Sequence, residues 1–196
     1  MYNCIFSGHC SEIQCDKSCP ILAQTTYLLD RSEISMNSPV FKMGKDAIDH
    51  YTSILKENEG KLAVVTTNES TTLVADGLTY CAICENWKGS RLHCTAFNLR
   101  FSKYLELVQK SWNFSSDSGG AEYAKIWATS AKVLIISNID YVNFKDFQAQ
   151  TLLSLLQDRS NPDLTTIIVS PRISSLIGEG PFFTRLTERL TQSKVV

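Results

Sequence analysis

The sequence lacks long apolar runs and any marked excess of charge. None of its apolar stretches approaches the roughly 18 residues that a membrane-spanning helix needs. The 196 residues carry a formal net charge of −1, which excludes a global field toward nucleic acid or a membrane, though not a local basic patch. The stretch Met1-Tyr2-Asn3-Cys4 lacks the basic and apolar regions of a signal peptide. We therefore expect a cytoplasmic protein whose cysteines are thiols or metal ligands rather than disulfides.

Familiar sets of catalytic side chains are also missing. Nothing in the sequence resembles a Ser/His/Asp set or a pair of catalytic carboxylates. His50 and His93 have no acidic or cysteine partner at ligand spacing, so both are expected to be structural. Cys81, Cys84 and Cys94 are expected to pack in the core, with a metal or redox role as the alternative.

Cysteine is abundant at the start of the chain. Cys4, Cys10, Cys15 and Cys19 lie close together, with His9 beside them as a reserve ligand. Four thiolates in a short segment suit a tetrahedral zinc ion, although the spacing is not that of two C-x2-C pairs. The same cysteines would suit an iron–sulfur cluster, and the third alternative is four thiols without a metal. We expect a metal-binding segment and helix over residues 1–31 and a linker over 32–44.

The centre of the α/β domain, residues 45–196, is the stretch from Lys132 to Pro171. Its two ends, around Ile135 and Ile168, are short apolar runs rich in β-branched residues, which is typical of strands buried on both faces of a parallel sheet. Between them, Phe147, Leu152 and Leu156 recur at helical spacing. Strand, helix and strand in this order predict a right-handed crossover.

Further elements are predicted on both sides of this crossover. The patterns favour strands over 61–67 and 91–97 and an edge strand from Lys194. They favour helices over 46–58, 78–88, 104–112, 121–130 and much of 172–192, the first of them capped by Asp46. The fold class is therefore α/β, with a parallel sheet between two helix layers.

The order and texture of these elements resemble one family. The segments AIDHYTSILKENEGKLAVVTT, GLTYCAICENWKGSRLHCTAF, KYLELVQKSW and AKVLIISNIDYVNFKDFQAQTLLSLLQDR fall in register with the AAA+ ATPases that load the bacterial replicative helicase, and with IstB-like transposition helper ATPases. The resemblance covers residues 45 to 196. It implies a three-layer P-loop-type fold and a nucleotide site at the carboxyl ends of the strands.

The nucleotide-binding motifs that the resemblance implies are degenerate. A P-loop (Walker A motif) needs glycines around the phosphates, a lysine and a magnesium-binding hydroxyl. Here Leu73 stands in the lysine position and Val74 in the hydroxyl position, and Glu69 would repel phosphate. The acids expected after the next motif strand (Walker B) are replaced by Ser137 and Asn138. The polar residues left at the degenerate site are Thr67, Ser70, Thr72, Ser137 and Asn138.

A second alignment places the phosphate loop at Lys88-Gly89-Ser90-Arg91. It supplies one glycine and two cations, but it requires residues 78–84 to form the preceding strand. We rank it below the first alignment because it leaves the strand at 61–67 without a counterpart.

These losses predict a protein that binds rather than hydrolyses. The main hypothesis is a catalytically inactive subunit of a phage or mobile-element replication or transposition assembly, with an AAA+ subunit or replicative helicase as partner, possible DNA contact and hetero-oligomers. Arg185, or failing that Arg172, would reach a neighbour's nucleotide, with Phe182 and Phe183 at the contact; a solvated basic face of Arg172, Arg185, Arg189 and Lys194 is the alternative. The rival functions are an unusual active ATPase loader and a metal-dependent nucleic-acid-binding module.

Overall fold

A computed structural model shows the fold of the sheet domain. The described residues are 43–86, 96–112, 119–139, 145–171, 181–191 and 194–195. The predicted metal ligands Cys4, Cys10, Cys15 and Cys19 lie outside them, as do residues 87–95, Asp140 and Arg172. Within the described residues, no helix is long and apolar enough to cross a membrane.

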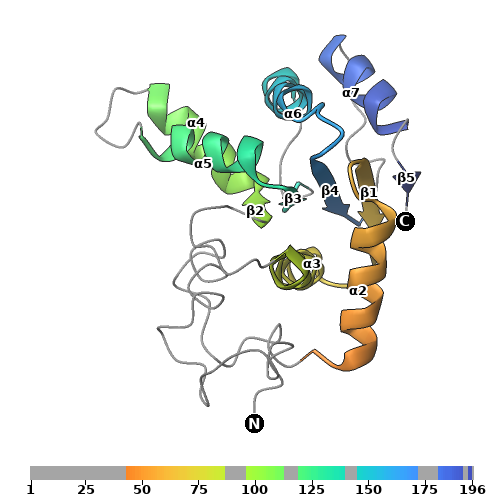
Figure 1. Ribbon diagram of the computed structural model, residues 1–196. Coiled ribbons are helices and arrows are strands. Elements are labelled where there is room, and N and C mark those ends of the chain that lie inside the picture. The colour runs from red at the N-terminus through yellow and green to blue at the C-terminus, as the bar shows by residue number, and fades with distance from the viewer. Residues whose placement is uncertain are drawn as a thin grey trace.

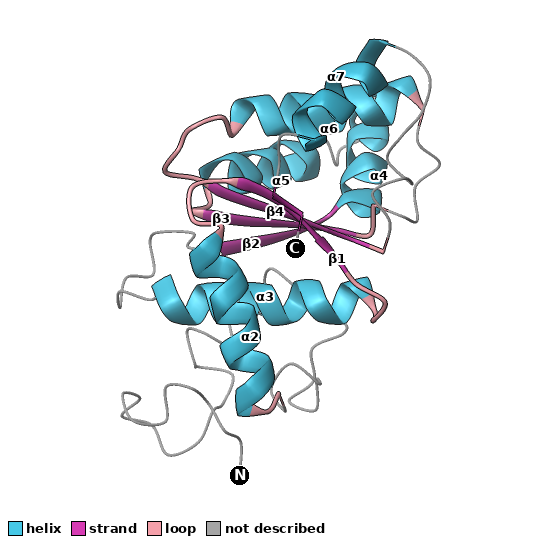
Figure 2. Ribbon diagram, turned by 90° about the vertical axis from the view of Figure 1, so that its right-hand side faces the viewer, coloured by secondary structure: helices cyan, strands magenta, loops and turns pink. Residues whose placement is uncertain are grey.

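Five parallel strands form the sheet at the centre of the molecule (Figure 2). They are β1 (Leu62–Thr66), β2 (Ala96–Arg100), β3 (Val133–Ser137), β4 (Thr165–Ser170) and the two-residue β5 (Lys194–Val195). Their order across the sheet is β2-β3-β4-β1-β5, so β1 lies between the last two strands of the chain. The fifth strand pairs with β1 only at Ala63 and Val64.

Helices cover both faces of the sheet (Figure 1). On one face lie α2 (Lys45–Glu57) and α3 (Thr71–Asn86). On the other lie α4 (Phe101–Trp112), α5 (Gly119–Ser130), α6 (Asp146–Asp158) and α7 (Pro181–Thr191). The chain is thus a three-layer α/β fold with a parallel sheet, as predicted.

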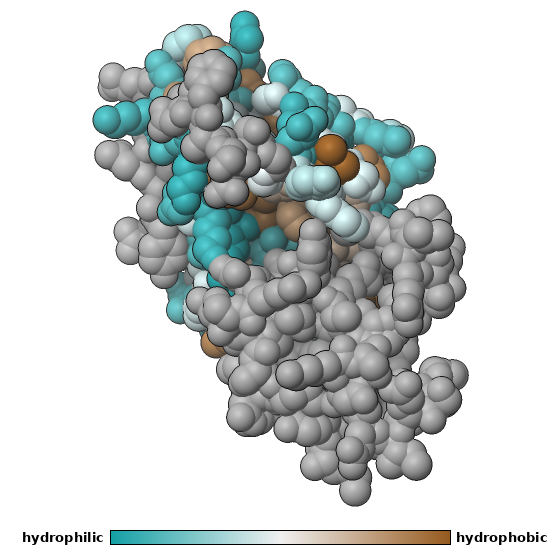
Figure 3. Space-filling view, turned by 90° about the vertical axis from the view of Figure 1, so that its left-hand side faces the viewer, coloured by the Kyte–Doolittle hydropathy of each residue, from teal (hydrophilic) through white to brown (hydrophobic). Residues whose placement is uncertain are grey.

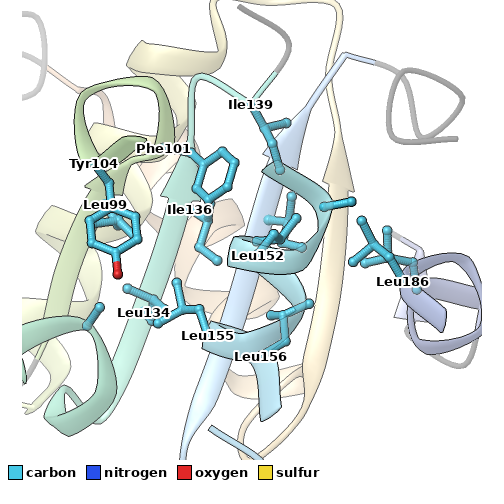
Figure 4. Packing of buried hydrophobic residues seen from close by; sticks show 14 of the residues in the cluster. Leu99, Phe101, Tyr104, Leu134, Ile136, Ile139, Leu152, Leu155, Leu156 and Leu186 are labelled. Carbon is cyan, nitrogen blue, oxygen red and sulfur yellow. The ribbon is translucent and has the colours of Figure 1, made fainter. Parts of the chain in front are cut away.

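The two cores follow from alternation along the strands. Leu134 and Ile136 of β3 pack with α4 to α7, whereas Val133 and Ile135 pack with α2 and α3. Because successive strand residues point to opposite faces, strands covered on both sides must be apolar at every position. Figure 4 shows the first core, where Leu152, Leu155 and Leu156 of α6 lie over the sheet beside Leu134 and Ile136.

Helix α3 is buried almost all round. Residues Val74 to Ile83 are all buried, so the helix has no solvent-facing stripe. Gly77 allows α2 to approach closely, because a Cβ there would lie 2.5 Å from Cε2 of Tyr51. Cys81 is also in the core, which confirms its predicted packing role, and the neighbouring Tyr80 is buried as well.

Two arginines join the ends of helices on the face of the sheet that α4 to α7 cover. Arg159, just after α6, is buried and donates from Nη1 to the carbonyls of Ala128 (2.7 Å) and Ala131 (2.8 Å) at the end of α5. Arg189, in the last turn of α7, donates from Nη2 to the Leu156 carbonyl (2.9 Å) and to Ser160 Oγ (2.8 Å) at the end of α6. Each guanidinium satisfies acceptors that a helix end leaves open.

Some predicted boundaries are wrong. The second strand extends to Arg100 instead of ending at Phe97, and α4 begins directly after it, while residues 91–95 of the predicted strand lie outside the described residues. Asp46 does not cap α2, because the N-cap residue is Gly44 and Asp46 lies in the first turn. His50, predicted to be structural, is exposed, and its ring lies 5.8 Å from that of Tyr51. The remaining strands and the helices α2, α4, α5 and α6 occur where the patterns predict them.

The outer surface mixes polar and apolar side chains. Figure 3 shows both kinds interspersed over the described part of one face. Among the described residues, the exposed large apolar side chains are Leu73, Tyr123 and Ile126, with exposed fractions of 44%, 65% and 53%.

Candidate functional site

The carboxyl ends of four strands meet at one edge of the sheet. The parallel register places Thr66 opposite Ser170 and Arg100 opposite Ser137. The loop after β1 and the start of α3 lie at this edge, where α/β proteins of this kind place their ligands. The degenerate motif positions are therefore brought to the place that the alignment predicts.

The loop after β1 is short and turns at once into α3. The Glu69 N–H donates to Thr67 Oγ1 at 3.0 Å, and the Val74 N–H donates to the Ser70 carbonyl at 3.1 Å. The helix begins at Thr71, so the alternative alignment, which needs a strand over 78–84, is wrong. Ser70 and Glu69 are exposed and carry no glycine-like freedom to wrap a phosphate.

A hydrogen bond joins the two degenerate motifs. Thr72 Oγ1, in the first turn of α3, donates to Asn138 Oδ1, just after β3, at 3.1 Å. Asn138 has a φ of 57°, a left-handed conformation that asparagine tolerates better than most residues. This backbone turn directs the chain away from β3 at the site edge.

The threonine hydroxyl that reaches the end of β3 is not at the position where the alignment expects the magnesium-binding hydroxyl. Val74 was aligned with the magnesium-binding hydroxyl, but it is 3% exposed and packs in the core, while Leu73 is exposed. Thr72, two positions earlier, is the residue that reaches the end of β3. Seven residues, 67–73, separate β1 from Val74, which is the number that a P-loop has before its hydroxyl. The spacing therefore fits the alignment, although Val74 supplies no hydroxyl.

A buried polar chain continues from this edge into the sheet. Ser137 Oγ donates to Asn98 Oδ1 at 2.9 Å, and Asn98 Nδ2 donates to Asp76 Oδ1 at 2.8 Å. All three residues are buried, on β3, β2 and α3 respectively. Sequence reasoning missed Asn98 and Asp76, because the partners are 39 and 22 residues apart and share no local motif.

These side chains offer little to a nucleotide. In P-loop ATPases a hydroxyl and an acid hold the magnesium ion, whereas Thr72 and Asn138 are neutral and bonded to each other. The buried carboxylate of Asp76 accepts a hydrogen bond from Asn98 inside the core. Among the described residues, no group of three His, Cys, Asp or Glu side chains is placed to hold a metal ion.

The predicted trans-acting arginine lies on α7. Arg185 is exposed, and Arg172 lies outside the described residues. Phe183 is 3% exposed and belongs to the core, so its ring is not available for the predicted contact, whereas Phe182 is only partly buried against the same core.

Comparison with known proteins gives the fold. The structure resembles domain III of the replication initiation protein DnaA from Thermotoga maritima, with a TM-score of 0.56 and 14% identity over 80% of this chain and 64% of that one. It also resembles AMPPCP-bound DnaA from Aquifex aeolicus, with a TM-score of 0.52 and 12% identity over 78% of this chain and 43% of that one. The chain thus spans less than two thirds of either structure, and the likeness shows the fold that it shares with them. No protein-family model and no curated protein matches the sequence.

Proposed function

We propose that this chain is a catalytically inactive AAA+-like protein that acts as a binding or regulatory subunit in a phage or mobile-element DNA replication or transposition assembly. The AAA+ fold supports the proposal, as does the likeness to two DnaA structures, one of which is domain III of a replication initiation protein. The helicase-loader and IstB-like pattern of residues 45–196 supports the narrower assignment.

The bond between Thr72 and Asn138 carries the proposal. A magnesium–nucleotide complex would need both groups to turn toward the metal, and neither contributes the negative charge that the metal prefers. Loss of the lysine at Leu73 removes a charge-assisted bond to phosphate, worth about 1.5–3 kcal/mol. Several such losses together would remove useful affinity for ATP.

Nucleotide binding is tested first. Thermal unfolding is followed with magnesium-ATP, with ATP plus a chelator, and with neither, and hydrolysis is assayed on the same sample. We expect no magnesium-dependent stabilisation and no turnover. Magnesium-dependent stabilisation that disappears in Thr72→Val would overturn the inactive assignment and favour a working ATPase.

The partner is tested by direct capture. We propose that an AAA+ subunit or a replicative helicase binds this chain in a hetero-oligomer, with Arg185 facing the partner's nucleotide or an acidic surface, because an arginine supplied in trans can stabilise phosphate charge. Purified helicase and AAA+ proteins of the host are passed over the immobilised chain. Arg185→Ala and Arg172→Ala are compared with Lys110→Ala, which removes an exposed cation from α4.

Each outcome of the capture experiment has one meaning. Binding that Arg185→Ala abolishes and Lys110→Ala preserves supports the arginine mechanism. Binding that none of the three changes keeps the scaffold role and discards the arginine. A chain that stays monomeric and captures none of these proteins contradicts the proposal.

A further inference from the structure

A pocket lies at the opposite edge of the sheet from the degenerate nucleotide site. Its volume is about 220 Å3, and it is formed where β1 begins, where α6 ends and where the last turn of α7 passes. Gly60 and Lys61 line it from just before β1, Ser160 and Asn161 from just after α6, and Arg189 from α7. The amino ends of parallel strands point here, so nothing at the Thr72 edge shares this space.

The charge of the pocket is positive. Lys61, Arg159 and Arg189 line it, and no Asp or Glu is among its lining residues. The neighbouring carboxylate of Glu59 is paired with Lys132, whose Nζ lies 3.2 Å from its Oε1. Asp158 is likewise paired with Lys125 at 3.3 Å. Three cations around a small cavity attract an anion, and more strongly than on an open surface.

Arg189 holds donor capacity that the fold does not use. Its two resolved bonds both come from Nη2, to the Leu156 carbonyl and Ser160 Oγ. Its Nε is buried and has no hydrogen-bond partner. Leaving a buried donor of a charged group without a hydrogen bond is costly, so such a group calls for an explanation.

Two further residues with donor groups line the same cavity. The Lys61 ammonium uses one donor, to the Glu57 carbonyl at 3.3 Å, and can form three bonds. Asn161 Oδ1 accepts from the Asp163 N–H at 2.9 Å, which fixes the amide and leaves its NH2 group to serve as donor. Arg159, saturated by backbone carbonyls and by Thr166 Oγ1, adds charge without being needed as a donor.

We propose that this pocket binds a phosphate group through Lys61, Arg189 and Asn161. A phosphate has several acceptor oxygens and suits a site with an ammonium, a guanidinium and an amide around it. Free phosphate and the terminal phosphate of a nucleic acid strand share this chemistry. The pocket is independent of the inactive-ATPase proposal, since it lies at the other edge of the sheet and needs neither magnesium nor Thr72.

The full-length chain is titrated with inorganic phosphate by calorimetry, with chloride keeping the ionic strength constant. Lys61→Gln and Arg189→Gln are compared with Lys110→Gln, which makes the same change of net charge far from the pocket. We expect saturable binding that Lys110→Gln leaves unchanged. Loss of one charge-assisted bond should weaken phosphate binding by about tenfold in each pocket variant. Because Arg189 also holds the end of α6, Lys61→Gln, whose side chain is exposed, is the decisive variant.

The source of the phosphate is distinguished with an oligonucleotide prepared with and without a 5′-phosphate. Tighter binding of the phosphorylated strand, lost in Lys61→Gln, assigns the pocket to a nucleic acid end. Equal binding of the two strands, with inorganic phosphate still bound, assigns it to the free ion. The proposal is overturned if phosphate does not saturate the protein, or if folded Lys61→Gln binds phosphate as the natural chain does.

Discussion

At the scale of single residues, Asn138 combines a left-handed backbone with a side-chain acceptor. Replacing it by alanine removes the bond from Thr72 and keeps a Cβ in a left-handed conformation, which costs about 1–2 kcal/mol relative to glycine. Asn138→Gly removes the same bond without that cost. We expect Asn138→Ala to unfold at lower urea concentration than Asn138→Gly, by about 1 kcal/mol in the free energy of unfolding. Equal stability of the two variants would show that the backbone at this position is relaxed.

Cys81 should make the stability of the protein depend on pH in the alkaline range. Burial, with a smaller contribution from the Glu85 carboxylate, raises the pKa of this thiol from 9.0 to about 11, against the opposing hydrogen bond with Thr52. The unfolded chain therefore loses the proton at lower pH than the folded chain does. The stabilisation is complete below pH 9.0 and is lost as pH rises to about 11.

Urea unfolding at a series of alkaline pH values tests this. Cys81→Ala should lose less stability across the same window, although Tyr51 and Tyr104, whose pKa values are also raised by burial, continue to contribute in both proteins. Parallel pH profiles for Cys81→Ala and the natural chain would contradict the prediction.

At the scale of elements, the contact between α2 and α3 depends on Gly77. Alanine is favoured over glycine in a helix interior by about 1 kcal/mol. Here the new Cβ would lie 2.5 Å from the Tyr51 ring, so we expect Gly77→Ala to lower the free energy of unfolding by about 1–3 kcal/mol instead. In a Tyr51→Ala background the same change should become neutral or stabilising, which a double-mutant cycle by chemical denaturation would measure.

The elements also show where sequence patterns succeed. The runs around Val64, Ile135 and Ile168 are apolar at consecutive positions, and all three became strands buried on both faces. The end of strand β2 was predicted at Phe97, before Arg100, because Asn98 interrupts the apolar pattern at a buried position. That asparagine is acceptable only because Asp76 and Ser137 satisfy it, and these partners come from distant parts of the chain. No local periodicity reveals such a compensation.

The sequence predicted where the candidate site lies, but not which of its side chains bond to each other. Family resemblance placed the two motif positions after β1 and β3, and the structure puts both at one edge. The bond between Thr72 and Asn138 was not predicted, because it depends on where α3 begins. The patterns predicted this helix from residue 78, whereas it begins at Thr71, and sequence patterns fix helix ends poorly.

At the scale of the whole molecule, the cysteine-rich segment gives a prediction that stands apart from the sheet domain. We expect Cys4, Cys10, Cys15 and Cys19 to bind one zinc ion or one iron–sulfur cluster. Element analysis after anaerobic purification, with the visible absorption spectrum, measures the metal and separates the two. Cys15→Ser should lose the metal and loosen residues 1–31 to proteolysis, while residues 45–196 keep their thermal unfolding transition. A metal-free natural chain would leave the cysteines as ordinary thiols.

The arginines at the ends of α6 and α7 have a consequence for how the molecule opens. Because Arg159 holds the end of α5 and Arg189 holds the end of α6, none of these three helices can fray at that end without breaking a link to the next. Guanidinium groups stay charged at all ordinary pH values, so the links persist from acid to alkali. Amide hydrogens of α5, α6 and α7 should therefore exchange with deuterium through one shared opening event. Arg159→Met should release α5 to exchange earlier than α6 and α7, turning one cooperative unit into two.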